Sequence, residues 1–100
     1  MKQEIFSIAI FEVLPGKRKA ALASMSELMA ALAAGGYSRD VLYRDGRSGR
    51  EFVLLRHWKS EQQRRAALED AAVLRCWAKL AEEIQTVKVY ETLEEVESFE

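Results

Sequence analysis

The sequence predicts an α+β protein of the ferredoxin-like class, a four-stranded antiparallel sheet with two helices on one face. Two observations lead to this prediction. Strand-like and helix-like patterns follow one another in the order β-α-β-β-α-β, which is the split βαβ arrangement. The first and third strand-like segments are apolar on both faces, as expected for strands inside a sheet. A chain of 100 residues forms one domain, so residues 1–100 are expected to fold as a single unit.

The first strand is predicted over residues 4–14, where both alternating sets of side chains are apolar, and Pro15-Gly16 ends it. A helix is predicted from there to about residue 34, because Ala, Lys, Leu, Met and Glu dominate the stretch. Gly35-Gly36 then supplies the left-handed residue that commonly closes a helix. The apolar stripe of this helix consists of Leu22, Met25, Leu28, Met29 and Leu32.

A hairpin of two strands follows, over residues 37–45 and 50–58, with "DGRSG" at its tip. Side chains alternate between the two faces of a strand. His57 and Trp58 therefore point to opposite faces of the third strand unless a bulge intervenes. The two sets are Phe52, Leu54, Arg56 and Trp58 on one face, and Val53, Leu55 and His57 on the other.

The second helix should begin after Ser60, because Ser60 and Gln63 have the spacing of a capping box. The helical pattern weakens near Asp70 and resumes as an amphipathic stripe. Residues 86–93 alternate polar and apolar side chains and predict the fourth strand, and residues 93–100 are predicted to be a loose tail or one that docks on a partner. The stripe consists of Val73, Trp77, Leu80 and Ile84, and the docking side chains of the tail would be Val96 and Phe99.

Charge and cysteine content limit the partners and cofactors of this chain. With 15 basic and 16 acidic residues the net charge is −1, so neither nucleic acid nor an anionic membrane is expected as a partner. No apolar run is long enough to span a bilayer, and residues 5–10 do not have the pattern of a signal peptide. Cys76 is the only cysteine, which fits a reducing compartment and argues against a metal site. We therefore expect a cytoplasmic protein without a metal.

The two-faced strands also predict an assembly. Two helices cover only one face of a four-stranded sheet, so the other face would present a large apolar patch to water in a monomer. Packing two such sheets face to face would cover the patch in both copies. The sequence therefore predicts a homodimer.

Four stretches that together cover most of the chain resemble the antibiotic biosynthesis monooxygenase family of dimeric α/β-barrel proteins: "FEVLPGKRKAAL", "GGYSRDVLYRD", "FVLLRHWKSEQQRRAAL" and "VKVYETLEEV". The resemblance implies a small homodimer with a pocket between sheet and helices in each subunit. Some members oxidise polyphenols or quinols with O₂ and without metal or flavin, others degrade haem, and many have no established activity. Haem-degrading relatives carry an Asn on the first strand, whereas residues 4–14 contain none.

Oxygenation without a cofactor requires a base, an apolar pocket that keeps the deprotonated substrate reactive, and donors that stabilise the developing oxyanion. His57 is the predicted base, because the ordinary pKa of histidine lies near neutrality. Aromatic side chains would form the walls of the pocket and an arginine would hold an anion. The predicted substrate-binding residues are Phe11, Tyr43, Trp58, Trp77, Arg39 and Arg56.

Two functional classes stay open at this point. The first is a cofactor-independent monooxygenase that acts on an aromatic, polyphenolic or quinol substrate. The second is a non-catalytic dimer that binds a small apolar ligand or regulates a partner. In the second class His57 would be a structural residue at a strand end, and Trp77 would belong to the core. An open pocket between sheet and helices is expected in the first class, whereas a fully packed interior would favour the second.

Overall fold

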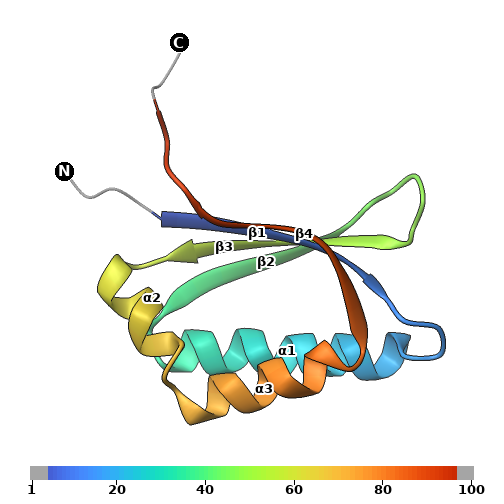
Figure 1. The fold of residues 1–100 in the computed structure, drawn as a ribbon, viewed down its shortest axis with the longest axis horizontal. Helices are drawn as coiled ribbons and strands as arrows, with labels where there is room; N and C mark the ends of the chain where they lie inside the picture. The colour runs from blue at the N-terminus through green and yellow to red at the C-terminus, as the bar shows by residue number, and fades with distance from the viewer. Residues whose placement is uncertain (1–4, 97–100) are drawn as a thin grey trace.

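A computed structural model describes residues 5–96, which form a four-stranded antiparallel sheet with all helices on one face (Figure 1). The spatial order of the strands is β2-β3-β1-β4. This confirms the predicted fold class. The elements are β1 (Ile5–Val13), α1 (Arg18–Ala34), β2 (Ser38–Arg44), β3 (Glu51–Trp58), α2 (Glu61–Ala67), α3 (Ala71–Ala81) and β4 (Ile84–Leu93).

Helix α1 lies where the sequence predicts it and buries the expected stripe against the sheet. Met25, Leu28 and Leu32 are almost completely buried, and Leu22 and Met29 pack against the same core. At its end Gly35 keeps a right-handed backbone, whereas Gly36 has φ +71°, a value that side chains other than glycine rarely adopt. Gly36 is therefore the residue that turns the chain from α1 into β2.

The second predicted helix is two helices in the structure. Helix α2 starts at the predicted cap, where the Ser60 hydroxyl accepts a hydrogen bond from the Gln63 amide at 3.1 Å. Asp70 then begins α3, because its carboxylate accepts hydrogen bonds from the Ala72 and Val73 amides. Ile84, predicted on the stripe of the second helix, is instead the first residue of β4. The Leu14 amide binds the Glu83 carbonyl just before it and draws the chain onto β1, so β4 begins two residues earlier than predicted.

Asp70 also links the α2–α3 junction to the α1–β2 connection, because its carboxylate accepts a hydrogen bond from the Tyr37 hydroxyl at 2.7 Å. This bond is the main cause that lowers the pKa of Asp70 below its ordinary value, and the amides of α3 act in the same direction. The same bond raises the pKa of Tyr37. The folded protein therefore favours the ionised form of Asp70.

We expect Asp70→Asn to lower the melting temperature at pH 7, because Asn still caps a helix but carries no charge for the Tyr37 hydroxyl and the α3 amides. A carboxylate whose pKa is lowered by folding stabilises the protein above its unfolded pKa of about 4, and that stabilisation is lost as the pH falls through the folded value. The gap between wild type and variant should therefore narrow below about pH 4. Calorimetric scans at several pH values measure it, with Glu69→Gln, an exposed neighbour, as control. A gap that is constant with pH contradicts this role.

The third strand alternates as predicted, and only one of its faces looks toward the helices. Its buried set packs with α1 and α3 into the core and consists of Phe52, Leu54, Arg56 and Trp58. The other set is only partly covered and consists of Val53, Leu55 and His57. In β1, Ala9 and Phe11 belong to the helix side, because they pair with Leu54 and Phe52 across the strands.

The sheet face without helices is defined here as the open face. One apolar row crosses all four strands on it, because the register aligns Val41, Leu55, Ile8 and Tyr90. Strand β4 lies at the sheet edge, and Tyr90, its member of this row, is 38% exposed. Both predicted apolar faces are therefore present, and one of them is uncovered in the single chain.

The last described residues extend beyond β4 without regular structure, and Val96 is 93% exposed. The predicted docking residue Phe99 lies outside the described residues. Within residues 5–96 no helix has the length and apolar character needed to cross a membrane.

Candidate functional site

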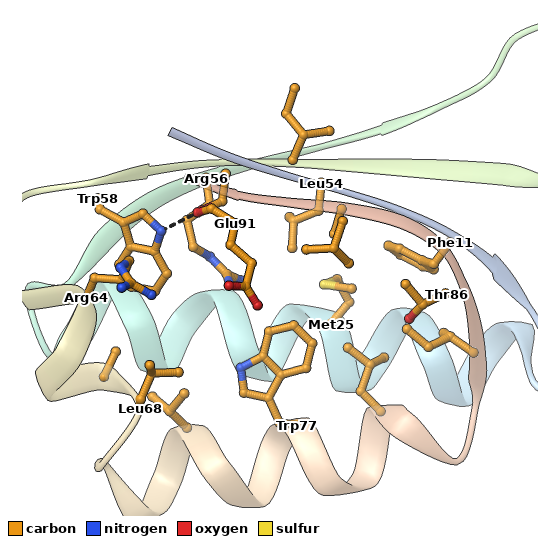
Figure 2. A pocket seen from close by; sticks show the side chains of 18 residues that line it. Phe11, Met25, Leu54, Arg56, Trp58, Arg64, Leu68, Trp77, Thr86 and Glu91 are labelled. Atoms are coloured by element: carbon orange, nitrogen blue, oxygen red, sulfur yellow. Dashed lines mark hydrogen bonds between the residues drawn. The ribbon is translucent and has the colours of Figure 1, made fainter. Parts of the chain in front are cut away.

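A cavity of about 280 Å³ lies between the sheet and the helices (Figure 2). Its lining comes from β1, β3 and β4 above and from α1, α2, α3 and the α2–α3 turn below, and most of these side chains are apolar. Leu68 and Val89, about half exposed, belong to the lining, so the cavity reaches the surface beside β4. The interior is therefore an open pocket rather than a sealed core.

Both tryptophans of the chain line this cavity, Trp58 from β3 and Trp77 from α3. The guanidinium carbon of Arg56 lies 5.3 Å from the centroid of the Trp58 ring and 5.5 Å from that of Trp77. Both distances are within the range of cation–π contacts. Arg56 thus holds the two indoles around one buried positive charge.

The charge of Arg56 is balanced by Asp40 on the neighbouring strand β2. The Nε and Nη2 atoms of Arg56 donate to the Asp40 carboxylate at 2.8–3.0 Å. The side chains of Arg56 and Asp40 are only 7% and 2% exposed. The Ser38 hydroxyl donates to the same carboxylate at 3.0 Å. A bidentate pair of this kind fixes the guanidinium plane, so Arg56 has a defined position behind the cavity.

Ser7 connects three strands at the same end of the cavity. Its hydroxyl accepts a hydrogen bond from the Trp58 indole N–H at 2.7 Å and donates to the Glu91 carbonyl. An indole N–H only donates and a carbonyl only accepts, so both directions are settled by chemistry. The plane of Trp58 is therefore tied to the backbones of β1 and β4.

The charged side chains of the cavity other than Arg56 are Arg64 on α2 and Glu91 on β4. Arg64 makes two hydrogen bonds to Glu61, at 2.8 and 2.9 Å, and these, with a smaller contribution from Arg65, lower the pKa of Glu61 to about 2. The same bonds are the main cause that raises the pKa of Arg64, and the negative charge of Glu91 adds to it. Arg64 and Glu91 are therefore close enough to influence each other.

The structure divides the predicted site residues into two groups. Phe11, Arg56, Trp58 and Trp77 all line the cavity. Arg39, Tyr43 and His57 have the opposite parity and lie on the open face, where Arg39 is paired in register with His57. The His57 ring packs on Phe6, with centroids 4.6 Å apart. The functional roles given to these residues stay predictions.

Four polar residues of the cavity were not predicted from the sequence: Ser7, Arg64, Thr86 and Glu91. Ser7 offers a signal, because it is the one hydroxyl inside the apolar strand of residues 4–14. Arg64 and Glu91 offer none, because each is one of many charged residues in its segment. Among residues 5–96 no group of three His, Cys, Asp or Glu side chains is arranged to hold a metal ion.

Several solved structures have the same fold and superpose on nearly the whole chain. PA3566 from Pseudomonas aeruginosa superposes with a TM-score of 0.80 at 19% identity and covers 97% of this chain and 98% of its own. SnoaB, a cofactor-independent oxygenase from Streptomyces nogalater, gives 0.78 at 16% identity, with coverages of 97% and 100%. Rv0793 from Mycobacterium tuberculosis gives 0.73 at 21% identity, with coverages of 94% and 99%. At these identities the similarity establishes the fold alone.

Among curated proteins none matches the chain. The sequence model of the antibiotic biosynthesis monooxygenase family, in contrast, matches residues 5–79, which span all elements from β1 to most of α3. This is three quarters of the chain, and it includes the strands and helices that form most of the cavity. The chain therefore belongs to the antibiotic biosynthesis monooxygenase family.

Proposed function

We propose that this protein binds a flat aromatic substrate of the polyphenol or quinol type in the cavity and oxidises it with O₂, without a metal or organic cofactor. The observation that carries the proposal is an open, mainly apolar cavity with both tryptophans in its lining. Indoles bind flat aromatic rings by stacking and edge-to-face contacts. The resemblance in fold to SnoaB, which is a cofactor-independent oxygenase, supports the reaction type.

The reaction balances with substrate and O₂ alone when the substrate is an anthrone-like phenol. A base removes a proton, and the carbanion or phenolate gives one electron to O₂. The two radicals join through a new C–O bond, and a proton completes the hydroperoxide. The O–O bond then breaks as the remaining hydrogen on that carbon leaves as a proton, so one oxygen atom becomes a C=O group and the other leaves as water. Substrate deprotonation is the step for which a protein base is needed.

Two measurements test the proposal. Binding of 2,3-dimethyl-1,4-naphthoquinone should quench the fluorescence of Trp58 and Trp77, because both indoles line the cavity. The methyl groups block the ring positions to which the Cys76 thiol would otherwise add. With anthrone the protein should consume one O₂ per quinone formed, above the rate without protein, after treatment with a chelator. Quenching without any O₂ uptake over a panel of anthrones and naphthalenediols would leave only the binding role.

His57 is the predicted base, although it lies across the sheet from the cavity. A role in proton transfer would therefore require a substrate that reaches the open face. For such a substrate His57→Ala should lower O₂ uptake by a factor of about 10² or more with the fold retained, as for the loss of a general base, whereas uptake with a substrate that stays in the cavity should be unchanged. Phe6→Leu, which changes the ring that packs on His57, is the matched control. Unchanged uptake in His57→Ala would make His57 a structural residue.

The second candidate function is a non-catalytic dimer that binds a small apolar ligand. The position of His57 favours it, because the cavity lining contains no histidine. In this case the quinone would quench tryptophan fluorescence and raise the melting temperature, as expected for a ligand that binds only the folded state. No O₂ would be consumed with any substrate of the panel.

In either function we propose that the protein is a homodimer joined through its open face. The apolar row of Val41, Leu55, Ile8 and Tyr90 has no covering element among the described residues. A second copy would bring an identical apolar surface, and a two-fold axis across the sheet would cover both rows at once. The cavity lies on the other side of the sheet, so one site would remain open in each subunit.

A further inference from the structure

Strand β4 has an irregularity where it passes the cavity. Its pairing with β1 shifts between Phe6 and Ile8, which pair with Leu93 and Tyr90, so Glu91 and Thr92 both lie opposite Ser7. An extra residue of this kind is a β-bulge, and bulges redirect side chains next to functional sites. The hydrogen bond from the Ser7 hydroxyl to the Glu91 carbonyl holds the bulge in place.

The bulge brings the exposed Glu91 side chain to the mouth of the cavity. Figure 2 shows the Glu91 side chain extending from β4 toward α3 and Trp77, and Glu91 is part of the cavity lining. Among the described residues, Glu91 is the one acidic residue in the cavity lining. An ionised carboxylate only accepts hydrogen bonds, so it complements a ligand group that donates one.

The arginines of the cavity are already engaged. Arg56 is paired with Asp40 and Arg64 with Glu61, each through two atoms of the guanidinium. Within residues 5–96 no side chain donates a hydrogen bond to the Glu91 carboxylate, so its acceptor capacity is directed at the cavity contents and water. The two guanidinium groups in the lining disfavour a cationic ligand. A neutral donor such as a hydroxyl group is therefore the better complement.

We infer that Glu91 is a specificity-determining residue that selects aromatic ligands with a free ring hydroxyl, which donates a hydrogen bond to its carboxylate. This inference rests on the proposed function, in which a flat aromatic substrate enters the cavity, and it narrows that substrate to a phenol rather than a phenol ether. The aromatic ring lies against the indoles of Trp58 and Trp77, and the hydroxyl lies at the β4 side. The analogue that lacks the donor binds less tightly, because an ether group displaces water from the carboxylate without replacing its hydrogen bond.

Calorimetric titration with 2-naphthol and with its methyl ether tests the inference. Wild type should bind 2-naphthol at least about 10-fold more tightly than the ether, as expected for a hydrogen bond to a charged group. In Glu91→Ala this ratio should fall to about 1, mainly through weaker binding of 2-naphthol. Glu91→Gln, which retains an acceptor oxygen without the charge, should give an intermediate ratio. Glu94→Ala, an exposed carboxylate outside the cavity lining, should keep the wild-type ratio.

An unchanged ratio in Glu91→Ala would overturn the inference, as would a wild type that does not distinguish the two probes or binds neither. Circular dichroism checks that each variant is folded. The outcome is independent of turnover. A protein that prefers 2-naphthol through Glu91 but consumes no O₂ would refute the oxygenase function and keep this inference, whereas O₂ uptake with an unchanged ratio in Glu91→Ala would refute the inference alone.

Discussion

Replacing Asp40 with Ala is expected to lower the free energy of unfolding by about 3–5 kcal/mol, because the change leaves the Arg56 guanidinium buried without its anion. Asp40 and Arg56 are only 2% and 7% exposed in their side chains, so hydration offsets little of the lost ion pair. The Ser38 hydroxyl loses its acceptor as well. Urea unfolding at a fixed protein concentration, followed by circular dichroism, measures the difference.

Two controls separate the buried pair from charge effects in general. The double variant Asp40→Leu with Arg56→Met removes both charges, and it should recover most of the lost stability, because an apolar replacement of a buried pair is often neutral. Glu61→Ala breaks the partly exposed pairs with Arg64 and Arg65 and should have a much smaller effect. A double variant that is as unstable as Asp40→Ala would mean that packing rather than the unpaired charge causes the loss.

Asp40→Ala is also expected to change the cavity. Arg56 lies within cation–π distance of both indoles, and Asp40 fixes its orientation. When that support is lost, Ser7 still holds Trp58 but Arg56 no longer fixes Trp77 relative to it, so quinone binding should weaken even at a temperature at which the variant is folded. Binding with wild-type affinity would limit Asp40 to a role in stability.

Leu55→Asp is expected to convert the proposed homodimer into a monomer or to unfold it. Leu55 lies in the apolar row of the open face, between Val41 and Ile8. In a face-to-face dimer the carboxylate introduced by Leu55→Asp would be buried without a partner in both copies. An uncompensated buried charge costs several kcal/mol per site. Sedimentation equilibrium at micromolar concentration measures the mass, and circular dichroism reports whether the fold is retained.

The matched control for this prediction is Leu74→Asp. Leu74 is 47% exposed on α3 and does not line the cavity, so the same chemical change there should keep the mass of the wild type. A wild-type protein that sediments as a monomer at micromolar concentration contradicts the dimer. A Leu55→Asp variant with wild-type mass would place the contact between copies elsewhere on the molecule.

The core of the fold could be predicted because it depends on local patterns. The stripe of α1, the alternation of β3 and the cap at Ser60 each involve residues a few positions apart, so their spacing alone indicates the structure. The break between α2 and α3 was indicated in the sequence only by a weaker helical pattern near Asp70. Asp70 ends one helical pattern and begins the next through bonds to Ala72 and Val73, which divides the second predicted helix.

The site was only partly predictable, because it depends on contacts between distant segments. The parity of β3 separates His57 from Trp58, and this much follows from the sequence. The sequence does not determine which of the two faces the helices cover, because both faces of β1 and β3 are apolar. The packing of Leu28, Leu32 and Leu80 on the Leu54 side decides it, and it brings Arg56 and Trp58 into the cavity.

By itself the sequence determined the order of the elements, the alternation within each strand and the presence of two apolar sheet faces, because these follow from spacing along the chain and from the geometry of helices and strands. Only the tertiary structure decided which polar groups meet in the cavity. Arg56 is paired with Asp40 from the neighbouring strand, and Ser7 joins Trp58 to Glu91 across three strands. Such contacts depend on strand register and on the bulge in β4, which are set by the packing of the whole sheet rather than by any short stretch of residues.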